Sequence, residues 1–277
     1  MTSVRELLHC AADLPGDSAL RDAEVLLCHC ADKSRSWLYA WPECEVGSAV
    51  ADHYRRCLAA RRLGHPVAHL TGRREFWSLE LEVNAHTLIP RPETETLVEW
   101  ALQLPMPEDA QVIDLGTGSG AIILALASER DNWHFLGVDS SAMALAVARS
   151  NGQRLGLERV RFELSDWFGG VAEERFHLMV GNPPYIEQHD PHLGMGDLRF
   201  EPTEALISGA AGLADLAYLV NKAPEHLFPG GWLLLEHGFE QGDAVRQQLQ
   251  GRGFTDVQTR KDISGQERIT GGCRGAE

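Results

Sequence analysis

The sequence predicts an α/β fold in which a mostly parallel sheet carries helices on both faces and follows a small helical domain. Two observations support this prediction. From about residue 91 onward, apolar strands alternate with amphipathic helices, which is typical of a parallel sheet covered on both faces. Before about residue 72, apolar residues recur at helical spacing.

The first 72 residues are predicted to form the helical domain. Three segments show helical periodicity: VRELLHCAADL (4–14), SALRDAEVLLCHCA (18–31) and VADHYRRCLAARRLG (50–64). Asp17 or Ser18 can cap the second helix, and Gly64 with Pro66 ends the third.

Residues 73–90, RREFWSLELEVNAHTLIP, are predicted to form a β-hairpin. Leu79 and Leu81 alternate with Glu80 and Glu82, and a period of two indicates a strand with one buried face. The predicted organisation is a helical domain (1–72), a hairpin linker (73–90) and an α/β domain (91–277).

The α/β domain is predicted to contain five strands followed by two more. The five are QVIDLG (111–116), WHFLGVD (133–139), VRFELSD (160–166), FHLMVGN (176–182) and GWLLLEHG (231–238). The helices between them are ILALASER (123–130), AMALAVARSNGQRLG (142–156) and LADLAYLVNKAPEHLF (213–228). The tail, FTDVQTRKDISGQERITGGC (254–273), predicts two strands joined by a turn at Ser264-Gly265.

Composition narrows the possible functions. The chain is 44% hydrophobic and 23% charged, which is ordinary for a globular protein. Its formal net charge of −15 is a poor match for non-specific binding to a phosphate backbone. No apolar run approaches a membrane span, and the first 13 residues are too short and polar for a signal peptide. These features favour a cytoplasmic protein.

The six cysteines match neither a disulfide framework nor paired zinc ligands in their spacing. Cys28-His29-Cys30 invites a metal-site interpretation. However, the three residues lie in a helical pattern, where adjacent side chains point apart. We therefore expect reduced thiols and no metal.

Polar residues follow four of the predicted strands, at the edge of a parallel sheet where ligands bind. The first strand leads into Asp114 and a glycine loop made of Gly116, Thr117, Gly118, Ser119 and Gly120. The second ends in Asp139, close to the distance beyond such a loop at which an acidic side chain meets ribose hydroxyls. The third ends in Asp166 and Trp167, and the fourth in Asn182, Pro183, Pro184 and Tyr185. Together they indicate an adenosine-bearing cofactor whose reactive end faces Asn182.

Each of these signals has a purely structural alternative. The glycine loop can be a tight strand–helix turn, Asp139 an ordinary helix cap, and Trp167 a packing residue. Pro183-Pro184 can simply stop a strand. Two consecutive prolines also make a stiff loop, because they fix two φ angles and push the preceding residues into extended conformations.

The motifs resemble those of class I S-adenosylmethionine-dependent methyltransferases, which implies a seven-stranded Rossmann-like sheet. Asn-Pro-Pro-Tyr is similar to the motif of enzymes that methylate a nitrogen on a planar, conjugated acceptor. The flanking segments resemble the PrmC (HemK) family of protein-(glutamine-N5) methyltransferases, which modify the Gly-Gly-Gln loop of peptide chain release factors. These segments are GRREFWSLELEV, TLIPRPETE, SDWF, NPPYIEQHDPHL, GDLRFEP and LLLEHGFEQG.

The resemblance implies a role for each site residue. The glycine loop, Asp139, Asp166, Trp167 and Asn182 would bind S-adenosylmethionine, which leaves as S-adenosylhomocysteine. The Asn182 side-chain oxygen and the Pro183 carbonyl would accept the two amide hydrogens of the glutamine. Pro184 would complete the substrate site, and Tyr185 would pack against the amide plane. The helical domain would dock the release factor, with no direct nucleic-acid or membrane binding, in a protein expected to be a monomer.

Several features leave alternatives open. The segment 89–95, which includes Arg91, is expected to border the site, although Glu93 and Glu95 can instead cap the following helix. Glu236-His237 is a candidate catalytic base, although this transfer needs no strong base and a packed pair is the alternative. A basic cluster is either a solvated surface or a docking surface; its members are Arg55, Arg56, Arg61, Arg62, Arg73 and Arg74.

Two other functions compete with release factor methylation. An Asn-Pro-Pro-Tyr enzyme can act on a nucleic-acid base or on another protein glutamine, but a base-modifying enzyme calls for a basic recognition region. A non-enzymatic cofactor sensor is the second alternative, in which an intact Asn182-Pro183-Pro184 would serve no purpose.

Overall fold

A computed structural model describes residues 2–14 and 18–275. The chain forms two compact units. One comprises Met1–Arg73 and His192–Phe200, and the other Arg74–Pro191 and Glu201–Glu277. None of the helices in the described ranges has the length and apolar character needed to cross a lipid bilayer.

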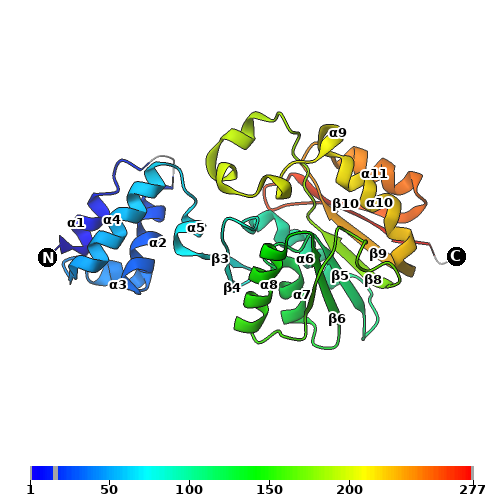
Figure 1. Cartoon of the computed structure of the whole chain (residues 1–277), viewed down its shortest axis with the longest axis horizontal. Coiled ribbons are helices and arrows are strands. Elements are labelled where there is room, and N and C mark those ends of the chain that lie inside the picture. The colour runs from blue at the N-terminus through cyan, green and yellow to red at the C-terminus, as the bar shows by residue number, and fades with distance from the viewer. Residues whose placement is uncertain (1, 15–17, 276–277) are drawn as a thin grey trace. The chain divides into compact units, whose positions relative to one another are not determined.

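The first unit is mainly helical (Figure 1). Its elements are β1 (Thr2–Ser3), α1 (Val4–His9), α2 (Ala19–Ala31), α3 (Arg35–Ala40), β2 (Glu45–Val46), α4 (Ser48–Arg62) and α5 (Val67–Thr71). Helices α2 and α4 pack on each other and contribute Leu26, Leu27, Tyr54 and Leu58 to a core of fully buried side chains. Burial of these side chains is the main source of stability for such short helices.

The helices of this unit differ in detail from the prediction. The first ends at His9 rather than at residue 14, and α3 and α5 lie in segments where no helix was predicted. Helices of five or six residues are too short to show a periodic apolar pattern. Ser18 occupies the N-cap of α2 without a side-chain hydrogen bond, and Asp17 lies outside the described residues.

The predicted hairpin is present as β3 (Arg73–Phe76) and β4 (Leu79–Glu82), which pair with each other. Trp77 and Ser78 form the turn, both with φ near +55°. Glu95 does not cap its helix; its Oε1 instead accepts a hydrogen bond from the Trp77 backbone N–H at 2.9 Å. This contact ties the strained turn to the start of α6 (Glu95–Gln103).

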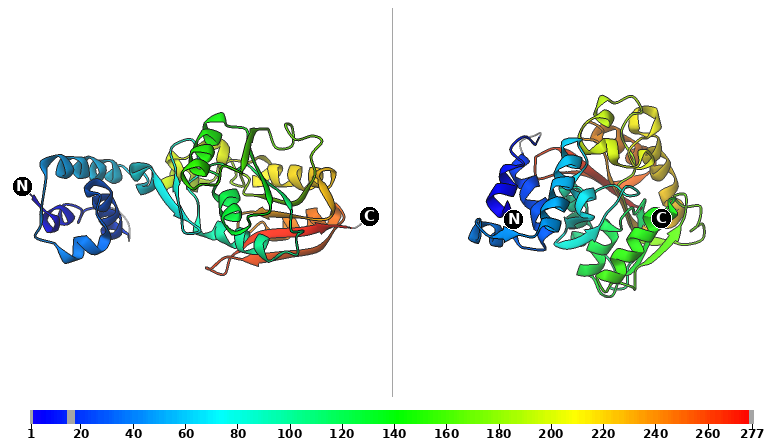
Figure 2. Two further views of the ribbon diagram at one scale, coloured as in Figure 1. Left: turned by 90° about the horizontal axis from the view of Figure 1, so that it is seen from below. Right: turned by 60° about the vertical axis from the view of Figure 1, so that its left-hand side comes forward.

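The second unit contains the predicted seven-stranded sheet in the order β10-β11-β9-β8-β5-β6-β7. Strands β9, β8, β5, β6 and β7 pair in parallel, and β11 lies between β9 and the edge strand β10 and runs antiparallel to both. Figure 2 shows the sheet from two further directions. The strands are β5 (Gln111–Leu115), β6 (His134–Asp139), β7 (Arg161–Leu164), β8 (Phe176–Gly181), β9 (Leu227–Glu236), β10 (Phe254–Lys261) and β11 (Glu267–Arg274). The α/β fold class predicted from the sequence is therefore confirmed.

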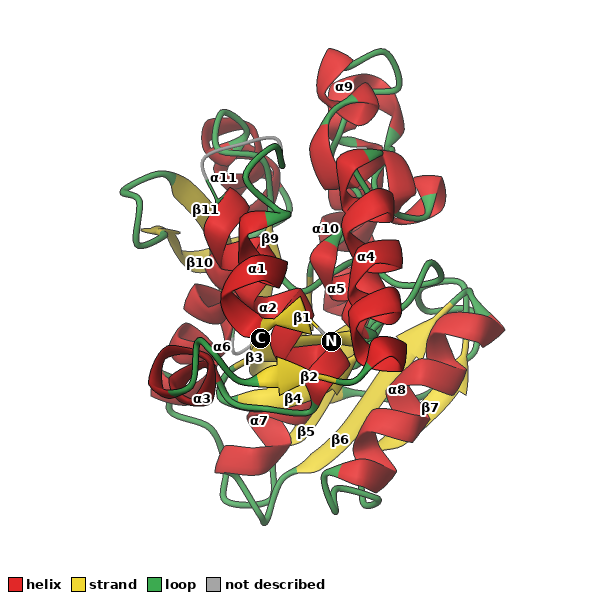
Figure 3. Cartoon of the chain, turned by 90° about the vertical axis from the view of Figure 1, so that its left-hand side faces the viewer, coloured by secondary structure: helices red, strands yellow, loops and turns green. Residues whose placement is uncertain are grey.

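Helices cover both faces of the sheet, and Figure 3 shows α8 along β6 and β7. The other helices of this unit are η1 (Pro92–Thr94), α7 (Ala121–Glu129), α8 (Ala142–Arg154), η4 (Thr203–Ala205), α9 (Gly209–Gly212), α10 (Ala214–His226) and α11 (Gly242–Gly251). Two short helices, η2 (Pro191–Gly194) and η3 (Gly196–Phe200), lie almost entirely in the segment that clusters with the helical unit. Alternate residues of β5 point to opposite faces: Val112 packs with α6 and α7, and Ile113 with α10 and α11. Helix α6 is the helix that was expected to follow Glu93 and Glu95, whereas α11 was not predicted although it is amphipathic.

The topology explains where a ligand can bind. From β5 the chain moves outward through β6 and β7, then returns to the other side of β5 with β8 and β9. The order therefore reverses between β5 and β8, and a crevice forms at the carboxyl ends of strands at such a point. Leu115 pairs with Gly181 in the ladder, so the glycine loop and the Asn182 loop leave the sheet side by side.

Candidate active site

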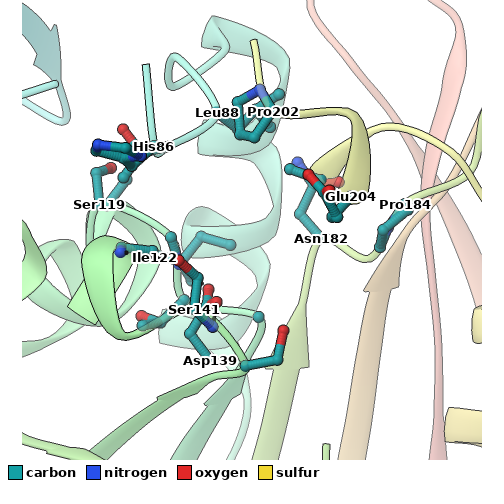
Figure 4. Close-up of a pocket in the computed structure, with 18 of the residues that line it drawn as sticks. His86, Leu88, Ser119, Ile122, Asp139, Ser141, Asn182, Pro184, Pro202 and Glu204 are labelled. Atoms are coloured by element: carbon teal, nitrogen blue, oxygen red, sulfur yellow. Dashed lines mark hydrogen bonds between the residues drawn. The ribbon is translucent and has the colours of Figure 1, made fainter. Parts of the chain in front are cut away.

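A cavity of about 660 Å³ opens at the carboxyl ends of the central strands. Residues after β5, β6, β7 and β8 line it, together with the segments around residues 86–94 and 202–207. In Figure 4, Asp139 and Ser141 lie toward one end of the cavity, and Asn182, Pro184 and Glu204 toward the other. The volume is within the range of pockets that hold small-molecule ligands.

The glycine loop wraps one wall of the cavity through Gly116, Thr117, Gly118 and Ser119. Gly116 and Gly118 have φ values of +75° and +55°, a left-handed conformation that side chains disfavour. A Cβ on Gly116 would also lie 3.4 Å from the Trp167 ring. Gly120, the last residue of the loop, is the N-cap of α7, so its role is to turn the chain into the helix.

Asp139 joins two loops of the site. Its Oδ2 accepts a hydrogen bond from the Gly118 N–H at 2.9 Å, and its Oδ1 accepts one from the Ser141 N–H at 2.8 Å. The N-cap of α8 is Ser141, whose hydroxyl accepts from Ala144, so Asp139 is not the cap. Burial raises the pKa of Asp139. Each carboxylate oxygen keeps a lone pair for a ligand hydroxyl.

The loop after β7 forms the third predicted part of the site. Ser165 is buried; its hydroxyl donates to the Trp167 carbonyl at 2.7 Å and accepts from the Gly170 N–H at 2.8 Å. These bonds hold Trp167 at φ +49°, an uncommon conformation for a large side chain. Asp166 is exposed, and it lines the cavity together with Trp167.

The fourth part is the loop after β8. Asn182 and Pro184 line the cavity, while Pro183 is buried beside them. The Asn182 side-chain nitrogen lies 3.5 Å from the Thr94 hydroxyl, to which it donates. Further along, Ile186 pairs with Ile207 in a short parallel bridge that fixes the far end of the loop.

A buried carboxylate lies next to this loop. Glu236, at the end of β9, is 1% exposed and accepts hydrogen bonds from Thr94 at 2.6 Å and from the Tyr185 hydroxyl at 3.3 Å. Burial raises the pKa of Glu236 to about 7 and also raises the pKa of Tyr185. His237 is also buried, and Tyr185 directs its hydroxyl toward Glu236.

An ion pair lies at the cavity. Arg91 lines the cavity and donates to Glu201 at 2.6 Å. The other Glu201 oxygen lies 3.3 Å from the Ile89 N–H, which donates to it. The Glu201 side chain is fully buried, so this pair fixes the segment that leads into Thr94.

The cysteines lie in the helical unit except Cys273, which lies on β11 of the second unit. The six cysteines, all within the described residues, are free thiols. Cys30 approaches Cys57, not Cys28, with 3.9 Å between the sulfurs, and His53 lies close to both. Burial raises the pKa of Cys30 to about 12, so its thiol is protonated at neutral pH.

Three arginines of the basic cluster pair with acidic side chains. Arg55 pairs with Asp52, Arg62 with Asp13, and Arg61 with Asp22. Neutralised in this way, these three side chains add little to a basic surface for an anionic partner.

Solved structures share the fold of the second unit. A methyltransferase from Pyrococcus furiosus superposes with a TM-score of 0.55 at 19% identity, over 71% of this chain and 89% of that one. A Thermus thermophilus 16S rRNA N2 G1207 methyltransferase, solved with AdoMet and guanosine, gives 0.51 at 20% identity, over 73% and 49%. The sheet order and the cavity at its carboxyl edge therefore define a protein of the class I methyltransferase fold.

Family models and curated relatives identify the family. Residues 6–72 match the PrmC N-terminal domain, and residues 94–205 match the methyltransferase small domain. The release factor glutamine methyltransferase of Pseudomonas aeruginosa is 50% identical over 270 residues, which cover 98% of both chains. The enzyme of that name from Escherichia coli is 45% identical, over 92% of both chains. The chain belongs to the release factor glutamine methyltransferase family.

Proposed function

We propose that this protein is a methyltransferase that transfers the methyl group of S-adenosylmethionine to the side-chain amide nitrogen of a glutamine in peptide chain release factors. The glutamine is the one in the Gly-Gly-Gln motif. Near-full-length identity of 45–50% to release factor glutamine methyltransferases is the observation that carries the proposal. The position of Asn182 beside the glycine loop supports it.

The residues around the cavity fit the cofactor. Asp139 offers a free lone pair on each oxygen, which suits a ribose diol, and its backbone bonds already fix its direction. Because glycines have no side chain, the backbone of the glycine loop can approach the ligand closely. Asp166 and Trp167 would hold the adenine. When bound, S-adenosylmethionine supplies an electrophilic methyl group on a positively charged sulfur.

The Asn182 loop would hold the acceptor. A carboxamide nitrogen is a weak nucleophile because its lone pair is delocalised into the carbonyl group. Its two hydrogens would be accepted by the Asn182 oxygen and the Pro183 carbonyl, which fixes the nitrogen and raises its electron density. Transfer would form the C–N bond while the C–S bond breaks, and the N-protonated amide, a strong acid, would release its proton to water. The main requirement is to align the sulfur, the methyl carbon and the amide nitrogen, with the reacting atoms about 3–3.5 Å apart. The stiffness of Pro183-Pro184 maintains this alignment.

The direct test is methyl transfer to a purified release factor, with mass spectrometry locating the added methyl group. We expect it on the glutamine of Gly-Gly-Gln, and a factor with that glutamine replaced by glutamate should remain unmodified. Asn182→Ala should lower turnover by about 10²–10³-fold, as for loss of one preorganised polar contact, and far more than it lowers cofactor affinity. Methylation of adenine in nucleic acid, or of no acceptor at all, would refute the proposal.

A further inference from the structure

The proposed chemistry requires the Asn182 amide to face one way. Its oxygen must point toward the acceptor, because its NH₂ group would confront the glutamine N–H bonds with two more donors. The two ends of a carboxamide are nearly the same size, so packing alone discriminates poorly between the two orientations. Hydrogen-bond partners must therefore select one of them.

The structure contains a chain of hydrogen bonds with a defined direction. The Thr94 hydroxyl has a single hydrogen, which it donates to Glu236 Oε2 at 2.6 Å. Its oxygen can then only accept from Asn182, whose nitrogen lies 3.5 Å away. The Asn182 nitrogen consequently faces Thr94, and the amide oxygen faces away from it.

Glu236 is the last group in this series of hydrogen bonds. It is 1% exposed, and the Tyr185 hydroxyl donates to its second oxygen. Arg268 on β11 attracts its charge, while Glu93, in η1, opposes it. His237, its neighbour on the chain, faces the other way: its ring nitrogens contact the Gly238 carbonyl and the Thr270 hydroxyl.

We propose that Glu236 and Thr94 are positioning residues that orient the Asn182 amide with its oxygen toward the acceptor glutamine. This inference rests on the proposed function. It assigns Glu236 a role other than that of a base, since Glu236 bonds to Thr94 and Tyr185 and acts through the former.

Ionisation of Glu236 should control this orientation. A protonated Glu236 can donate to Thr94, whose hydroxyl is then able to donate to the Asn182 oxygen and stabilise the reversed amide. Because burial raises the pKa of Glu236 to about 7, activity should fall as the pH drops below about 7. Asp114 is a second buried carboxyl whose pKa is raised to about 7 by burial, so the pH profile needs a control.

The first experiment compares Thr94→Val with Thr94→Ser. Valine keeps the shape of threonine but lacks the hydroxyl, so kcat should fall on the order of 10-fold, as for other contacts that orient a reacting group. The KM for release factor and the Kd for S-adenosylmethionine should change little. Serine keeps the hydroxyl and should recover most of the rate. Equal kcat values for Thr94→Val and the wild type would overturn the proposal.

The second experiment measures kcat against pH. The wild type and Asp114→Asn should both lose activity below about pH 7, whereas Glu236→Gln should have a lower rate that is flat across this range. An acid limb that persists in Glu236→Gln would overturn the proposal. Melting temperatures of the three proteins show whether each is folded over the pH range.

A third measurement does not depend on activity. In ¹⁵N-labelled protein, the side-chain NH₂ signals of Asn182, identified by their loss in Asn182→Ala, should shift near pH 7 in the wild type but not in Glu236→Gln. This result together with an unmodified release factor would refute the proposed function while supporting the hydrogen-bond chain. If the Asn182 NH₂ signals of the wild type do not change with pH, the proposed hydrogen-bond link from Glu236 through Thr94 to Asn182 is refuted.

Discussion

Asp139 supports the cofactor cavity in two ways at once. Its two oxygens accept hydrogen bonds from the N–H groups of Gly118 and Ser141, which belong to different loops, and the residue lines the cavity. A change at this residue therefore affects both a ligand contact and the shape of the glycine loop. The burial that raises its pKa also strengthens hydrogen bonds to a ligand, because water competes less.

Asp139→Ala should weaken S-adenosylmethionine binding by about 1.5–3 kcal/mol, the range for hydrogen bonds to a charged partner. Titration calorimetry measures the affinity, and circular dichroism shows whether the variant is folded. Asp131→Ala is a suitable control, because that side chain is 92% exposed just before β6 begins. Unchanged affinity in a folded Asp139→Ala protein would remove Asp139 from the cofactor site.

Residue patterns alone could predict part of this site. Asp139, Trp167 and Asn182 were predictable because each follows an apolar strand, and parallel strands end at one edge. The link between Thr94 and Glu236 was not, because these residues are 142 positions apart and meet only through the packing of α6 and η1 against the sheet. The sequence hypothesis placed Tyr185 against the acceptor amide; the structure shows its hydroxyl bonded to Glu236.

At the scale of elements, the segment His192–Phe200 is unusual because it clusters with the helical unit although its flanks belong to the other unit. Arg61 at the end of α4 donates to Asp22 at 2.8 Å and to Asp197 at 3.5 Å. The His65 ring lies 4.2 Å from the ring of Phe200. The segment connects the Asn182 loop with Glu201, so both of its ends lead to residues of the cavity.

Arg61→Ala should loosen this segment, because it removes the ion pair with Asp197 and leaves Asp22, only 13% exposed, without its partner. We expect faster amide hydrogen exchange in residues 192–200 and a loss of unfolding free energy of about 1–3 kcal/mol for the helical unit. Arg62→Ala is the matched control, since Arg62 pairs with the exposed Asp13. Equal exchange in both variants would show that Arg61 does not hold the segment.

For the whole molecule, the fold class was more predictable than the helical boundaries. Apolar strands such as FHLMVG in β8 and LLLE in β9 are recognisable because the sheet buries both of their faces. Segment 192–200 could not be assigned to a unit from sequence, since its partners lie about 130 residues earlier and its composition is that of an ordinary loop.

Substrate choice is a property of the whole molecule. A glutamine amide is common on protein surfaces, so a cavity that recognises only this group cannot select one protein. Within 1–72, the residues that the structure describes contribute none of the side chains that line the cavity, and we propose that this segment docks the release factor. Removing them should leave S-adenosylmethionine affinity within a few-fold and sharply lower methylation of an intact release factor.

Truncation can lower methylation either because a docking surface is lost or because the cavity itself is disturbed. A short Gly-Gly-Gln peptide distinguishes these two causes. Truncation also strips segment 192–200 of its partners, including Arg61 and His65, which could disturb the cavity through Glu201. The peptide is too short to gain from a docking surface, so it should be a poor substrate for both forms and be methylated at nearly the same rate by each. If truncation lowers peptide methylation as much as release factor methylation, the helical unit acts by supporting the cavity and the docking proposal is wrong. If the truncated and full-length proteins methylate the intact release factor at the same rate, the helical unit neither docks the factor nor supports the cavity.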